Sequence, residues 1–109
     1  MTTKCKVGGC SSPVSPELRD YSLCLDHFLD NVQERCSGLA RQLELEGFRN
    51  PLRQAATQFI VASAARLARI GTDNPPKNQL ARGRLLNAML LLAELRERFD
   101  QAAAKKAGA

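Results

Sequence analysis

The chain has 109 residues, a formal net charge of +5, 44% hydrophobic residues, 5% aromatic residues and no tryptophan. A chain of this length forms one compact domain, or one small domain with an appendage. Because no stretch approaches the ~18 apolar residues of a membrane-spanning helix, and the N-terminus lacks the apolar segment of a secretory signal, we expect a cytoplasmic protein without a membrane span.

The first 23 residues predict turns and no regular element. They contain Gly8, Gly9, Pro13, Pro16 and four serines, and their apolar residues follow no sustained period. From Cys24 onward the apolar residues recur at helical spacing.

Three helices are predicted over residues of about 24–46, 51–70 and 79–104. The first two each carry one apolar stripe at helical spacing, which predicts burial of that face. The members of these stripes are, in the first helix, Leu25, Phe28, Leu29, Val32, Cys36, Leu39, Ala40 and Leu43, and in the second Leu52, Ala56, Phe59, Ile60, Ser63, Leu67 and Ile70.

The breaks between the helices follow from glycine and proline. Gly47 is expected to end the first helix in the left-handed conformation, and Gly71 to end the second. Asn50 is expected to cap the second helix, with Pro51 at its first position. The Asp-Asn-Pro-Pro segment at residues 73–76 cannot continue a helix. Short connections favour antiparallel neighbours, so the sequence predicts an all-α three-helix bundle.

Three cysteines and the single histidine have the spacing of a metal site. Cys5 and Cys10 form one close pair, and Cys24 and His27 form a second pair at the start of the first helix. Structural zinc sites use such paired Cys and His ligands in tetrahedral geometry. We therefore expect one structural zinc ion, held in a knuckle that is stapled to the helical bundle. The finger would occupy residues 1–28 and the bundle residues 24–109, sharing the first helix.

Two other interpretations of these residues are possible. Two disulfides would need an oxidising compartment, which the sequence does not suggest. A histidine buried in the core beside unrelated thiols is common, but His27 completes a ligand spacing. Cys36 is the surplus cysteine and is expected in the core, because it lies about 18 Å from Cys24 along a continuous helix.

The segment of residues 5–28 resembles a short treble-clef-like zinc finger that is common in bacterial and phage proteins. The resemblance lies in Cys5-Lys-Val-Gly-Gly-Cys10 and in Tyr21-Ser-Leu-Cys24-Leu-Asp-His27-Phe28. It implies a structural role for the four ligands, and such fingers often accompany nuclease or DNA-binding segments. This chain has no second histidine and an acidic finger flank at Asp20, Asp26 and Asp30, and residues 29–109 resemble no family that we could name.

Catalysis is not expected. A catalytic zinc keeps one position open for water, whereas four protein ligands close the site. The only histidine is a predicted ligand, so no Cys-His or Ser-His pair remains for nucleophilic catalysis.

The third helix has apolar residues around most of its circumference. It could be the central helix of the bundle, or it could bind a protein partner or a second copy through a face centred on Leu91 and Leu95.

A cationic cluster surrounds the turn between the second and third helices. It could be a solvated rim, or it could bind nucleic acid or an acidic protein surface. Its members are Arg66, Arg69, Lys77, Arg82 and Arg84. The sequence favours a small regulatory or interaction protein, with nucleic-acid binding through this turn as the alternative.

Overall fold

The computed structural model describes residues 4–108 and shows an all-α fold, as predicted. A short 3-10 helix, η1 (Pro16–Tyr21), precedes three long helices, α1 (Leu25–Glu46), α2 (Asn50–Asp73) and α3 (Gln79–Gly108). Residues 4–15, the described residues before η1, contain no regular element apart from one isolated antiparallel bridge between Lys4 and Pro13.

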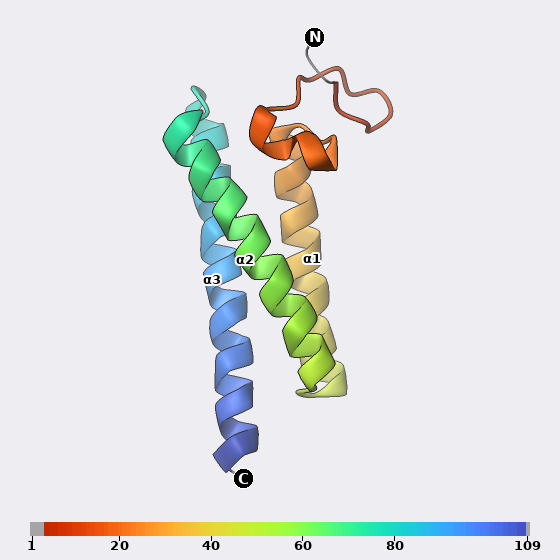
Figure 1. Ribbon diagram of the computed structural model, residues 1–109, viewed down its shortest axis with the longest axis vertical. Coiled ribbons are helices and arrows are strands. Elements are labelled where there is room, and N and C mark those ends of the chain that lie inside the picture. The colour runs from red at the N-terminus through yellow and green to blue at the C-terminus, as the bar shows by residue number, and fades with distance from the viewer. Residues whose placement is uncertain (1–3, 109) are drawn as a thin grey trace.

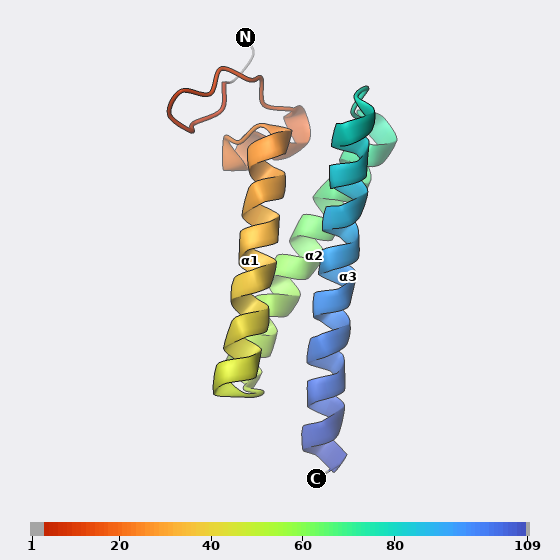
Figure 2. The ribbon, with the colours of Figure 1, turned by 180° about the vertical axis from the view of Figure 1, so that it is seen from behind.

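The three helices form an elongated bundle with extents of 54 × 26 × 19 Å. Helices α1 and α3 run lengthwise, and α2 crosses one face of them diagonally (Figures 1 and 2). Both α1 and α2 pack mainly against α3, and they contact each other much less. The N-terminal segment and η1 lie at the same end of the bundle as the turn between α2 and α3 (Figure 1).

Two predicted helix boundaries are wrong. Helix α2 passes through Gly71 and ends at Asp73, because Pro75 disfavours a helical conformation at Asn74. Asn50 is the first residue of α2 and not its cap, since Arg49 occupies the cap position with extended backbone and no side-chain cap hydrogen bond.

Gly47 does end α1, with the expected positive φ of 78°. Its ψ of 179° is extended, and so it lies outside the left-handed helical region. Its N–H donates to the carbonyl of Leu43 at 3.0 Å.

The core is formed by the predicted stripes of α1 and α2 together with one face of α3. Helix α3 contributes five buried apolar residues, as expected for the helix that both others contact. They are Leu85, Ala88, Leu92, Leu95 and Phe99.

The predicted partner face on α3 is therefore wrong in its centre. Leu95 is 3% exposed and belongs to the core, and Leu91 is half-buried and packs against the core. The exposed leucines on the opposite side of α3 are Leu86 and Leu90, each 62% exposed. Sequence alone could not choose between these faces, because α3 is apolar on both.

The N-terminal segment shares the core of the bundle. Val14, Leu18 and Leu23 are buried in the same cluster as the helix residues, and Leu18 is completely inaccessible. This packing fixes the segment that carries the first two cysteines beside the first turn of α1. Within residues 4–108, no helix has an apolar stretch of the length that a membrane span requires.

Candidate metal centre

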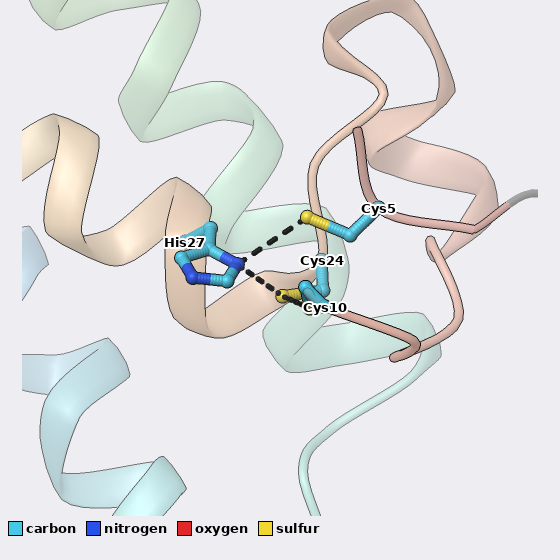
Figure 3. Close-up of side chains that lie close together, drawn as sticks. All are labelled: Cys5, Cys10, Cys24 and His27. Carbon is cyan, nitrogen blue, oxygen red and sulfur yellow. Dashed lines mark hydrogen bonds between the residues drawn. The ribbon is translucent and has the colours of Figure 1, made fainter. Parts of the chain in front are cut away.

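The four predicted ligands, Cys5, Cys10, Cys24 and His27, lie in one cluster (Figure 3). Their ligand atoms all lie within 4.8 Å of one another. Nδ1 of His27 lies 3.3 Å from Sγ of Cys5 and 3.2 Å from Sγ of Cys24. The sulfurs of Cys10 and Cys24 are 3.9 Å apart. The imidazole presents Nδ1 to the sulfurs, and its other nitrogen points away from them (Figure 3).

The first pair of cysteines is positioned by a tight turn and by backbone hydrogen bonds. Gly9 has a φ of 82°, a conformation that glycine adopts without strain, and it allows the Cys10 N–H to donate to the Val7 carbonyl at 3.0 Å. The N–H of Cys5 donates to Ser12 at 3.1 Å, and that of Lys6 donates to Ser22 at 2.8 Å. The Lys6 bond ties the segment of Cys5 to the residues just before Cys24.

The second pair is positioned by the start of α1. Cys24 is the N-cap residue with extended backbone, and His27 lies three residues later in the first turn. Residues three apart lie on the same face of a helix, so both ligand atoms face the first pair.

The distances fit a tetrahedral metal ion. With Zn–S bonds of about 2.3 Å and Zn–N bonds of about 2.0–2.1 Å, tetrahedral angles place two sulfurs about 3.8 Å apart and a sulfur about 3.5 Å from the nitrogen. The S···S distance of 3.9 Å and the two S···N distances of 3.2 and 3.3 Å are close to these values. The cluster can therefore hold one metal ion with four protein ligands.

The thiols of this cluster have strongly different proton affinities. Burial acts to raise the pKa of Cys5, but the backbone N–H groups of Cys24 and Val7 donate to its sulfur, and the pKa is lowered to about 6. Burial raises the pKa of Cys24 to about 11, and the neighbouring thiols of Cys5 and Cys10 add to this effect. A bound cation would favour the thiolate at Cys24, so metal binding releases protons.

Cys36 lies outside the cluster, as the sequence predicted. It is 5% exposed on the core face of α1, and burial raises its pKa to about 11. All four cysteines carry free thiols, so the disulfide interpretation does not apply to this structure.

The predicted cationic cluster is divided by the fold. Arg66 donates to the carbonyl of Glu17 at 2.7 Å and to the carboxylate of Asp20 at 3.0 Å. Its guanidinium also lies 4.8 Å from the ring centroid of Tyr21. These contacts are with η1, so Arg66 is engaged within the chain, and its predicted role in binding a partner stays a prediction.

Arg84 is bound in the same way to α1. Its two terminal nitrogens donate to Asp26 at 3.0 Å and to Asp30 at 2.6 Å. Two of the five cations are thus paired with the three acids of the finger flank. Asp26 and Asp30 lie four residues apart on one helix face, which indicates a shared cationic partner, but the arginine that contacts both is more than 50 residues away.

The other three cations, Arg69, Lys77 and Arg82, are exposed and form no ion pair among residues 4–108. Arg82 donates to the carbonyl of Pro76 at 2.6 Å, which places its side chain on the turn between α2 and α3.

Comparison of the chain with family models, with curated proteins and with solved structures gave no match. The case for a metal centre therefore depends on the spacing and the geometry of its four ligands.

Proposed function

We propose that this chain is a small non-enzymatic protein that binds one structural zinc ion and uses its helical bundle to bind another protein. The observation that carries the proposal is the convergence of three cysteine sulfurs and one histidine nitrogen within 4.8 Å. Thiolate-rich tetrahedral sites with an imidazole are typical of zinc in proteins.

The closed donor set supports a structural role. Four protein ligands leave no position for a substrate or an activated water on a tetrahedral ion. The single histidine of the chain is one of these ligands, so it is not available as a general base. The free thiols also support a reducing compartment such as the cytoplasm, in which cysteines bind metal instead of pairing.

The outer face of α3 supports the interaction role. Leu86 and Leu90 lie four residues apart on one side of the helix, each 62% exposed, and the buried residues of α3 lie on the other side. Exposed leucines at this spacing are typical of helices that anchor on a partner protein.

The alternative of nucleic-acid binding receives less support. Arg66 and Arg84 form ion pairs with carboxylates of the chain itself, so three of the five predicted cations remain to bind phosphates. Nucleic-acid affinity depends on the number of phosphates that Lys and Arg neutralise, so this loss weakens the predicted interface.

The metal part of the proposal is tested by elemental analysis of protein purified without chelators. We expect close to one zinc per chain in the wild type and loss of zinc in Cys10→Ser. Cys36→Ala is the matched control, because it removes a thiol outside the cluster, and it should retain zinc. Iron in place of zinc, or reduced wild-type protein without any metal, would contradict the proposal.

A further inference from the structure

Two arginines from the second half of the chain contact the segment before Cys24 and the first turns of α1, beside the predicted metal ligands. Arg84 of α3 contacts the first turns of α1 through Asp26 and Asp30. Asp26 lies between Cys24 and His27 in the sequence, so this contact acts directly on the helix turn that presents both ligands.

Arg66 of α2 holds the segment that leads into Cys24. It contacts η1 through a carbonyl, a carboxylate and an aromatic ring, at Glu17, Asp20 and Tyr21. The residue that follows η1, Ser22, has a φ of 56° and accepts the hydrogen bond from Lys6, next to Cys5. Arg66 therefore fixes the backbone that connects the first pair of ligands to the second.

We propose that Arg66 and Arg84 are positioning residues for the metal centre, so that metal binding and the packing of the α2–α3 end of the bundle are energetically coupled. This inference rests on the proposed function, since it requires that the cluster binds zinc. By reciprocity, the factor by which this packing raises metal affinity equals the factor by which the metal favours the packing. A protein that binds the α2–α3 turn and separates it from α1 would promote zinc release.

These contacts differ from the other interhelical ion pairs of the bundle. The Arg84 side chain is 34% exposed and contacts two carboxylates at 3.0 and 2.6 Å, although these carboxylates, of Asp26 and Asp30, are themselves 66% and 60% exposed. By contrast, Arg98 and Glu44 join α3 to α1 at 3.7 Å with side chains 57% and 72% exposed. Exposed pairs of the second kind contribute little, whereas short and forked contacts of arginine fix geometry.

The coupling is expected to act through geometry and not through charge. Zinc binding displaces thiol protons, which offsets much of the charge of the ion. Removing a cation at Arg84 and removing an anion at Asp30 should therefore both weaken zinc binding, although they change the net charge in opposite directions.

The test measures the zinc dissociation constant of the full chain by competition with a chromophoric chelator. For Arg84→Gln and for Asp30→Asn, we expect about three- to tenfold weaker binding, and no further loss in the double variant. Arg98→Gln is the matched control on the same two helices and should stay within about twofold of wild type. For α2, Arg66→Gln is compared with Arg69→Gln in the same way.

A second measurement tests whether zinc stabilises the packing of the α2–α3 end of the bundle. Zinc should slow amide hydrogen exchange in residues 66–73 and 79–88 of the wild type, and this protection should be smaller in Arg84→Gln. If Arg84→Gln loses helical circular dichroism, Arg84→Lys replaces it, because lysine keeps the charge but lacks the forked geometry.

Equal zinc affinity of wild type and both Arg84 variants would overturn the coupling, and so would equal losses in Arg84→Gln and Arg98→Gln. Opposite effects of Arg84→Gln and Asp30→Asn would also overturn it, because they would indicate a simple charge effect. Wild-type protein that binds no zinc would overturn the proposed function as well, which separates the two failures.

Discussion

Arg84 of α3 and Asp30 of α1 are 54 residues apart in the sequence, yet Nη2 of the arginine lies 2.6 Å from Oδ1 of the aspartate. The same arginine contacts Asp26 one turn earlier, so it spans the first two turns of α1. This relationship changes the meaning of two sequence features at once. The acidic finger flank and the basic turn are not two independent surfaces, because Asp26 and Asp30 of the flank are bound to Arg84 of the turn.

Cys36 provides a prediction about thiol chemistry. Because burial raises the pKa of Cys36 to about 11, its thiol should stay protonated and react slowly with iodoacetamide at pH 8. In the metal-free protein Cys5, with a pKa lowered to about 6, should react first. Mass spectrometry of peptides after timed labelling measures both rates. Labelling of Cys36 as fast as that of Cys5 would place it outside the core.

The raised pKa of Cys36 also has a consequence for stability. The ordinary thiol pKa is 9.0, and the value in the folded chain is about 11. The folded state thus holds this proton more tightly, and the resulting stability is complete below about pH 9 and is lost as the pH rises to about 11. Urea unfolding of wild type and Cys36→Ala between pH 8 and 11 should show a steeper alkaline loss in the wild type.

A pair of matched substitutions distinguishes the buried face of α3 from its exposed face. Leu95→Glu places a carboxylate in the core and should lower the free energy of unfolding by more than about 3 kcal/mol. Leu90→Glu changes an exposed position and should alter it by less than about 0.5 kcal/mol. Urea denaturation checks both values. If Leu90→Glu unfolds the protein, the assignment of the outer face is wrong.

Binding by the outer face is checked with Leu90→Glu and with Leu86→Glu. Leu90→Glu should stay folded and retain zinc while losing the partner protein, with light scattering recording whether that partner is a second copy. A partner that binds Leu86→Glu and Leu90→Glu as tightly as wild type would contradict the role of this face.

The exposed cations of the α2–α3 turn allow a test of the nucleic-acid alternative. Charge reversal at Arg69, Lys77 and Arg82 should leave folding and zinc content unchanged, because these side chains are exposed and form no ion pair among the described residues. We expect weak binding of duplex DNA and RNA by both forms at physiological salt. Tight wild-type binding that falls steeply with salt and disappears in the variant would favour the alternative instead.

Alanine substitutions at Gly71 and at Gly47 are expected to change the stability of the protein in opposite directions. Gly71 lies inside α2, and an added Cβ would meet Cδ2 of Leu85 at 3.7 Å, an ordinary contact. Gly71→Ala should therefore stabilise the protein by about 0.5–1 kcal/mol. Gly47 has a φ of 78°, so Gly47→Ala should destabilise it by about 1 kcal/mol. Thermal and urea unfolding measure both changes, and a destabilising Gly71→Ala would contradict the helical assignment there.

The local features of this protein could be predicted from its sequence. Apolar residues at helical spacing gave the three helices and the core faces of α1 and α2. Ligand spacing predicted which four side chains form the cluster, because Cys24 and His27 share a helix turn and a glycine turn presents Cys10. Gly71 misled the prediction of a helix end, since glycine lowers helix propensity without forbidding a helix, whereas the prolines that follow do end it.

The sequence by itself determined the helices, the ligand set and the burial of Cys36, since each follows from the spacing of residues within one continuous segment of the chain. The tertiary structure alone decided which side of α3 enters the core, because its apolar residues surround the helix and the choice depends on where α1 and α2 pack. It also decided that Arg66 contacts η1 and Arg84 contacts the first turns of α1, since ion pairs between segments about 50 residues apart form only after the bundle brings them together.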